Sequence, residues 1–202
     1  MAQPSARRGP GRAPAGTLDG RAALLAAARK VFAERGFAAA TTREILAGAG
    51  TTSPTLHHHF QSKAGLYLAV LHEVTGEIMT EFQAAVGDKT AFLDRVDAIM
   101  DASVAINRRD PAMSPIVFAA PIEARQNPEL ASAGERPTHL VTFIEEMCRT
   151  STGLGVDPDV AARGVMTVLY GLGRAAMSLD GDRYSEVVEA TRAMVHGNFG
   201  TA

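Results

Sequence analysis

The chain of 202 residues contains a single cysteine, Cys148, so no disulfide can form within it. Such sparing use of cysteine is typical of a reducing compartment, and we expect a cytoplasmic protein. No uncharged apolar run approaches the roughly 18 residues of a membrane-spanning helix. The best candidate has ten residues, between Arg163 and Arg174. The N-terminus also lacks the apolar segment of a secretory signal, so we expect no contact with a membrane.

Strand-like alternation of apolar and polar residues is nearly absent, and no segment repeats. The sequence has no glycine-rich phosphate loop, no serine nucleophile elbow, no paired histidine–carboxylate helix and no metal-ligand spacing. We therefore expect an all-α protein that is not an enzyme and that needs neither a cofactor nor a metal.

Charge is divided unevenly along the chain. Residues 1–66 hold nine Lys or Arg against three Asp or Glu, whereas residues 67–202 hold 11 against 19. The first third is thus net +6 and the remainder net −8, on a chain of net charge −2. A basic segment on an acidic remainder predicts that the first third faces a polyanion.

The first 16 residues are rich in Pro, Gly, Ala and Arg and have almost no apolar bulk. This composition predicts a disordered basic arm at residues 1–16. Two interpretations remain open, a solvated tail without defined contacts and an arm that enters a DNA minor groove.

Four helices are expected between Leu18 and the middle of the chain. Leu24, Ala28 and Phe32 recur at helical spacing, and Gly36 is placed to end the first helix. Two short helices and then one long helix are expected to follow. Each begins at or after a residue that can cap it. Their expected first residues or caps are Thr41 or Thr42, Thr52 or Ser53, and Ser62, and the expected ends of the two short helices are Ala49 and His59.

The rest of the chain keeps the helical period. Apolar stripes predict helices in the segments 92–104, 140–147, 160–179 and 187–195. Four prolines between residues 111 and 128 predict short, broken pieces in that region.

Two short helices joined by a glycine-containing turn, as expected at 42–49 and 53–59, are typical of a helix-turn-helix. In that motif the second helix enters the DNA major groove while the first crosses the backbone. Apolar residues would hold the pair from behind: Ile45, Ala49, Leu56 and Phe60. Polar residues of the second helix would face outward: Ser53, Thr55, His57 and His58.

Three consecutive histidines, His57, His58 and His59, end this second helix. Adjacent helical residues point about 100° apart, so the three rings cannot converge on one ion. No acid and nucleophile accompany them, as catalysis would require. A surface that binds nucleic acid fits best, while a solvated helix end and a metal or pH sensor remain open.

Residues 21–66 resemble the N-terminal DNA-binding domain of the TetR family of transcriptional repressors. His57 stands where the family commonly has tyrosine, and Thr51 where an apolar residue is usual, which leaves the operator sequence open. The residues in register with the family pattern are Phe32, Glu34, Gly36, Phe37, Thr42, Ala49, Gly50, Thr55, Leu56, Phe60, Ser62, Lys63 and Leu66.

The resemblance implies a three-helix helix-turn-helix DNA-binding domain at 17–66 and a larger helical ligand-binding and dimerisation domain at 67–202. Arg43 is the candidate for a guanine, because arginine can bind O6 and N7 together. By position, the expected base contacts are Arg43, Ser53, Pro54, Thr55 and His57. The expected phosphate contacts are Thr42, His58, His59 and Lys63.

Methionine and phenylalanine side chains suit an adaptable apolar pocket, although at helical spacing they fit an ordinary core equally well. Tyr170 and Asn107 are candidate polar anchors. The candidate pocket residues are Met79, Phe82, Phe92, Met100, Val104, Met113, Phe118, Phe143 and Met147.

Small residues share one face of the segment 160–179 and would let a second helix approach closely, although packing within one chain would explain them too. Val160 and Met194 could add apolar contact. The candidate dimer-interface residues are Gly164, Val168, Gly171, Leu172 and Ala175.

The expected function is a ligand-responsive transcriptional regulator that forms a homodimer. It would act as a repressor, released from a palindromic double-stranded operator by a small, largely apolar effector. Two alternatives remain, a helical small-molecule-binding protein that never contacts DNA and a metal-responsive regulator. Activation in place of repression also stays open.

Overall fold

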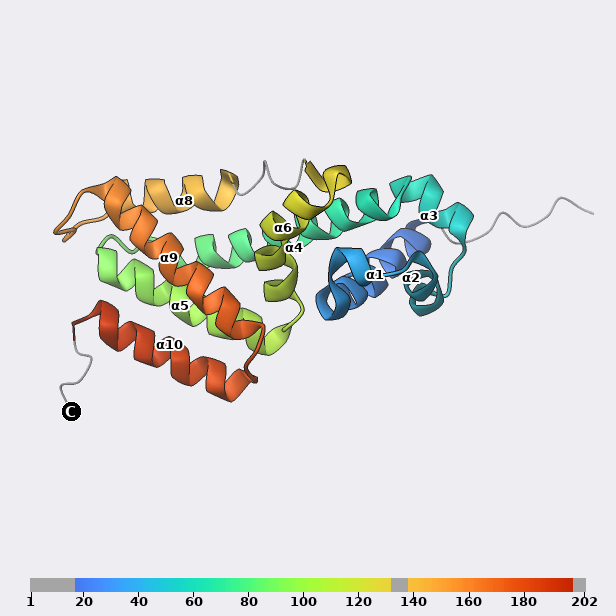
Figure 1. Cartoon of the computed structure of the whole chain (residues 1–202). Helices are drawn as coiled ribbons and strands as arrows, with labels where there is room; N and C mark the ends of the chain where they lie inside the picture. The colour runs from blue at the N-terminus through green and yellow to red at the C-terminus, as the bar shows by residue number, and fades with distance from the viewer. Residues whose placement is uncertain (1–16, 132–137, 198–202) are drawn as a thin grey trace, which may run out of the picture.

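The computed structural model describes residues 17–131 and 138–197, which form helices joined by short turns (Figure 1). The predicted all-α class is confirmed, whereas the predicted basic arm at 1–16 lies outside the described residues. Within the described ranges, no helix is long and apolar enough to cross a membrane. The elements are α1 (Thr17–Ala39), α2 (Thr42–Ala49), α3 (Ser53–Phe60), α4 (Lys63–Val86), α5 (Phe92–Arg109), α6 (Met113–Gln126), η1 (Pro128–Leu130), α8 (Thr138–Arg149), α9 (Pro158–Ala176) and α10 (Gly181–Val195).

Local side-chain and glycine chemistry sets the boundaries of the first helices. The helical backbone of α1 breaks at Gly36, which has φ 71° and ψ 174°. Thr41 and Glu44 form a reciprocal capping box at the start of α2, and Gly50 ends that helix in the left-handed conformation. The Ser62 hydroxyl accepts a hydrogen bond from the N–H of Gly65 at the start of α4. The boundaries of α2 and the start of α4 confirm the sequence-based expectations. Helix α1 continues past Gly36 to Ala39, and Thr52 makes no side-chain cap at the start of α3, which the sequence did not predict.

Helices α1, α2 and α3 form a three-helix unit that packs on the first turns of α4 (Figure 1). Tyr67 of α4 meets two aromatic rings of α1 edge-on, with centroids 5.0 Å from Phe32 and 5.2 Å from Phe37. Burial of this much apolar surface holds the unit together. The buried side chains of the unit and of the first turns of α4 are Leu24, Leu25, Ala28, Phe32, Phe37, Ala40, Ile45, Leu56, Phe60, Ala64, Leu66 and Tyr67.

The remaining helices gather around the far part of α4 (Figure 1). Helix α5 packs on α4 and α10, α8 packs on α9, and α6 lies between α1, α4 and α9. Arg29 of α1 joins the two parts, because its guanidinium pairs with Glu77 of α4 at 2.7 Å and with Asp110 after α5 at 2.6 Å. The three-helix unit is therefore attached to the larger part by ion pairs as well as by packing.

Pro115 and Pro121 do not break the chain as the sequence predicted, whereas Pro111 lies between α5 and α6 and Pro128 begins η1. Helix α6 is continuous over 14 residues, with Pro115 in its first turn and Pro121 in its interior. A proline in the first turn costs little, because the N–H groups there have no helical partner. Pro121 removes one hydrogen bond, and packing of α6 against α1, α4 and α9 holds the helix together around it.

Candidate functional site

Helix α3 presents a polar face to solvent and an apolar face to α1 and α4. Leu56 and Phe60 are buried, whereas Ser53, His57 and His58 are exposed, as the sequence predicted. Pro54 is also exposed, and Thr55 is half-buried beside Gly20 of α1. The outward side chains can therefore exchange hydrogen bonds with a bound partner. Among them, His57 already has a backbone oxygen as a neighbour.

The three histidines of α3 differ in their surroundings. Nδ1 of His57 lies 2.7 Å from the carbonyl oxygen of Gln61, a non-glycine residue with φ 64°. The His59 ring is half-buried, and its Nε2 is buried without a partner among the described residues. It packs edge-on against His58, with centroids 4.8 Å apart. His59 therefore points partly into the unit, which corrects the picture of a triplet that is wholly available to DNA.

The first turn of α2 is also accessible. Thr42 and Arg43 are exposed there, one turn before the buried Ile45 that anchors the helix. Helices α2 and α3 thus bring Arg43 and the polar face of α3 to the surface of one small unit. Such a surface can bind a phosphate backbone and base edges together.

Lys63 has a role in the fold that its charge did not reveal. Its ammonium group donates hydrogen bonds to the carbonyl oxygens of Phe37 at 2.8 Å and Ala40 at 3.1 Å. The same nitrogen lies 4.2 Å from the centroid of the Phe37 ring. Lys63 therefore ties the end of α1 to the start of α4, and one of its three N–H donors is left for another partner.

In residues 17–131 and 138–197, no group of three or more His, Cys, Asp or Glu side chains is placed to hold a metal ion. The three histidines of α3 are consistent with this, since adjacent helical positions diverge.

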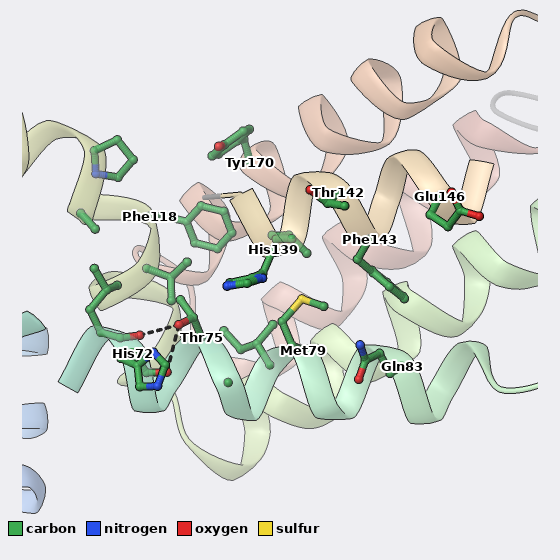
Figure 2. A pocket seen from close by; sticks show the side chains of 17 residues that line it. His72, Thr75, Met79, Gln83, Phe118, His139, Thr142, Phe143, Glu146 and Tyr170 are labelled. Carbon is green, nitrogen blue, oxygen red and sulfur yellow. Dashed lines mark hydrogen bonds between the residues drawn. The ribbon is translucent and has the colours of Figure 1, made fainter. Parts of the chain in front are cut away.

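A cavity of about 680 Å³ opens between α4, α6, α8 and α9 (Figure 2). Its volume lies in the range of small-molecule sites. Figure 2 shows Thr75 and Met79 on α4 facing His139 and Phe143 on α8, with Phe118 of α6 at one side. The apolar lining is Leu71, Ile78, Met79, Val117, Phe118, Ala120, Pro121, Leu140 and Phe143. The polar lining is His72, Thr75, Gln83, His139, Thr142, Glu146 and Tyr170.

The structure separates the nine side chains that the sequence grouped as one pocket. Met79, Phe118 and Phe143 line this cavity, and Tyr170 lines it as well. Other members of the group belong elsewhere because their helices turn them toward different neighbours. Phe92 and Met100 line a second hollow, Phe82, Met113 and Met147 are buried in the core, and Val104 is half-buried against it. The candidate anchor Asn107 is buried in α5 and is not part of the cavity lining.

The second hollow, of about 330 Å³, is an apolar groove between α5, α9 and α10. Its members on α9 include Val160, Gly164 and Val168. Large apolar side chains on α9 and α10 are exposed to solvent, with Val160 at 58%, Val187 at 36% and Met194 at 60%. Exposed apolar side chains on neighbouring helices are typical of a surface that another protein covers.

The residues proposed for a dimer interface are not all accessible. Gly164 and Gly171 are exposed, and Val168 and Ala175 are half-buried. Leu172 is only 3% exposed, because its position on α9 faces the core of its own chain. Leu172 is therefore a packing residue and not a surface one.

A helix-turn-helix unit with an exposed polar second helix defines a DNA-binding protein, and comparison with known proteins gives its class. Residues 24–70 match the model of the bacterial regulatory proteins of the tetR family. Residues 90–199 match the model of the tetracyclin repressor-like C-terminal domain. The chain belongs to the TetR family, and it is a DNA-binding transcriptional regulator and not an enzyme.

Two transcriptional regulators are similar to this chain over most of their length. The transcriptional regulator UidR of Escherichia coli K12 is 24% identical over 183 residues, which cover 88% of this chain and 91% of that protein. The transcriptional activator FasR of Mycolicibacterium smegmatis is 28% identical over 192 residues, which cover 91% of this chain and 84% of that protein.

Solved structures share the fold. GusR of Salmonella enterica superposes with a TM-score of 0.69 at 26% identity, covering 90% of this chain and 96% of that one. The fatty acid degradation regulator FadR of Bacillus halodurans superposes with a TM-score of 0.71 at 17% identity, covering 87% of this chain and 97% of that one. The structure of AibR contains isovaleryl coenzyme A and operator DNA. It superposes with a TM-score of 0.67 at 20% identity, covering 87% of this chain and 97% of that one.

Proposed function

We propose that this protein is a ligand-responsive repressor, released from a palindromic operator by a small, largely apolar effector. The observation that carries the proposal is the cavity of about 680 Å³, lined mainly by apolar side chains, in a chain with an accessible helix-turn-helix. AibR, with the same fold, is a protein whose structure contains both a small molecule and operator DNA. The regulator would act in the cytoplasm, where the DNA is.

In this proposal α3 enters the major groove. Arg43 and His57 are accessible and would approach base edges, together with Ser53, Pro54 and Thr55. Thr42 and His58 are exposed and would contact phosphates. Lys63 and His59 would add to phosphate binding less directly, because the structure gives both side chains neighbours within the three-helix unit.

The operator-binding form would be a homodimer. One short helix contacts too few base pairs to find a site in a genome, whereas two related by a twofold axis bind a palindrome with half-sites about 34–36 Å apart. The exposed apolar side chains of α9 and α10 support an interface there, with Gly164 and Gly171 allowing close approach. Val160, Val187 and Met194 would supply its apolar contact.

Effector binding would change the population of two states. Helix α4 begins at the helix-turn-helix and contributes Thr75, Met79 and Gln83 to the cavity wall, so a tilt of α4 would alter the spacing of the two recognition helices. An effector that weakens operator binding about a hundredfold needs a coupling free energy of about 2.7 kcal/mol.

Footprinting of the purified protein on the DNA upstream of its own gene tests the proposal. We expect protection of two half-sites about one helical turn apart, and loss of that protection with one member of a screen of small apolar compounds. If no double-stranded probe is retarded at low ionic strength, the protein does not act as proposed.

Light scattering after gel filtration tests the dimer. We expect a mass near twice 21.2 kDa for the wild type and a monomer for Met194→Glu, which places a charge in the apolar surface. Glu189→Ala, on an exposed position of the same helix, is the matched control and should stay dimeric. A wild type that is monomeric at micromolar concentration would contradict the interface.

A further inference from the structure

The three-helix unit meets α6 at a defined polar contact. Oε1 of Glu123 accepts a hydrogen bond from the backbone N–H of Phe37 at 2.8 Å. Asn127, one turn further along α6, donates from Nδ2 to Oε2 of the same carboxylate at 3.1 Å and to the backbone oxygen of Glu123 at 2.9 Å. The carboxylate is therefore held on one side by its own helix and on the other by α1.

The contact falls at the break in α1, and the glycine there makes it possible. Gly36 has φ 71°, a conformation that residues with side chains rarely adopt. A Cβ atom on Gly36 would lie 2.6 Å from Oε1 of Glu123. The bare backbone lets the carboxylate reach the next N–H, and no larger residue leaves that space.

The contact is part-buried and lies beside buried aromatic rings. Phe37 is only 1% exposed and packs with Tyr67, which is 2% exposed. Burial raises the pKa of the Tyr67 phenol, and the nearby Glu123 carboxylate raises it further. Without Glu123, the Phe37 N–H would lose the hydrogen bond that it makes in this part-buried setting, which is unfavourable. The hydrogen bond is thus specific in position and costly to lose.

Helix α6 also forms one wall of the effector cavity. Val117, Ala120 and Pro121 line that cavity, and Glu123 follows two residues after Pro121. Pro121 has no N–H, so the carbonyl of Val117 lacks its usual helical partner and α6 can bend most easily at this turn. A displacement of the cavity wall therefore acts on the segment that carries Glu123.

We propose that Glu123 is a positioning residue for DNA binding, which fixes the orientation of the three-helix unit on α6 and transmits movement of the cavity wall to that unit. The inference rests on the proposed function. It adds a connection from the cavity to the recognition helix that does not pass along α4. A three-helix unit held less firmly on α6 samples more orientations, and the additional freedom must be lost when DNA is bound.

Three variants test the inference, with DNA affinity measured by fluorescence anisotropy on the upstream fragment and amide exchange measured at Phe37. Glu123→Ala removes the acceptor and should weaken binding about tenfold, with faster Phe37 exchange. Glu123→Gln keeps an acceptor oxygen, so its DNA affinity should stay within about twofold of wild type. If the negative charge of Glu123 alone mattered, this variant would lose affinity as Glu123→Ala does. Glu129→Ala, an exposed position on η1, is the control and should behave as wild type.

Wild-type affinity and unchanged Phe37 exchange in Glu123→Ala would overturn the inference. If melting shows that this variant is unfolded, Asn127→Ala replaces it, because it loosens the carboxylate without removing it. A several-fold loss of affinity in Asn127→Ala would then support the inference, and wild-type affinity would overturn it. A wild type that binds no DNA at all would instead refute the proposed function, and the inference with it.

Discussion

The ring of Phe118 in α6 lies directly on the backbone of Gly173 in α9. A Cβ atom added to Gly173 would come within 2.0 Å of Cε2 of that ring. Phe118 also meets Tyr170 edge-on, with centroids 5.8 Å apart, and both side chains line the cavity. The glycine therefore sets how far Phe118 can withdraw from the cavity, and so sets the shape of the site.

Gly173→Ala should destabilise the protein by about 1–3 kcal/mol, because the new methyl group would overlap the Phe118 ring and force it to move. The displaced ring should also reduce the free volume of the cavity. Urea unfolding measures the first effect, and a crystal structure of the variant the second. Gly76→Ala is the control, since a Cβ there meets nothing within 4 Å and should leave stability equal or slightly higher. Wild-type stability of Gly173→Ala would contradict the packing described.

Arg43→Ala should weaken operator binding by about 1–3 kcal/mol and relax specificity at one base pair. The reason is that Arg43 is exposed at the first turn of α2 and can bind a guanine edge with two hydrogen bonds. Anisotropy titrations against a set of single-base operator variants measure both effects. Arg183→Ala, an exposed arginine on α10, should bind as wild type. Equal affinity of Arg43→Ala and wild type for every variant would remove Arg43 from base recognition.

Lys63→Ala should have two separable consequences. Loss of the hydrogen bonds to Phe37 and Ala40 should lower the melting temperature, because two carbonyl oxygens at the end of α1 lose a charged donor. Loss of a phosphate contact should reduce the slope of log affinity against log salt by about 0.9. Calorimetry and a salt titration measure the two. A lower melting temperature with an unchanged slope would assign Lys63 to the fold alone.

The capping box of α2 should make stability depend on acid pH. The side-chain hydrogen bond from Thr41 lowers the pKa of Glu44 below its ordinary value, and the Thr41 backbone N–H and Arg35 act in the same direction. A carboxyl whose pKa is lower in the folded state stabilises that state above its unfolded pKa, and the contribution disappears as pH falls through the folded pKa. Wild type should therefore melt above Glu44→Gln at pH 7, and the gap should close below about pH 4.

Melting curves of both proteins at several pH values between 7 and 3 measure this gap. Glu186→Gln, at an exposed position on α10, should show no gap at either end. If the difference between wild type and Glu44→Gln persists unchanged at pH 3, ionised Glu44 does not contribute through the cap.

The elements of the fold that depend on neighbours in sequence were predictable. Ser62, Thr41 and Gly50 act within three or four residues, so their capping roles could be inferred from the residues alone. The role of Lys63 could not, because the carbonyl groups that it contacts lie 23 and 26 residues away in the chain. Sequence gives its charge and not its partners.

The cavity was predictable in kind and not in detail. Helical period identifies which side chains face inward, and Met79 and Phe82 look equivalent by that criterion. Met79 lines the cavity while Phe82 is packed in the core, because the neighbouring helices separate around the first and close around the second. Polar residues of the cavity wall, such as His139, could not be predicted, because the helical period of apolar residues does not show which polar side chains face a cavity.

The burial of Cys148 has a practical consequence. It is the sole thiol of the chain, it is inaccessible to solvent, and burial raises its pKa, so the native protein offers little thiolate to an electrophile. A cysteine placed at Arg183, which is exposed on α10 and lies outside the expected DNA contacts, would then be the one cysteine that a maleimide dye modifies. The slower rotation of such a dye would report operator binding in real time, without a change at any residue that is expected to contact DNA.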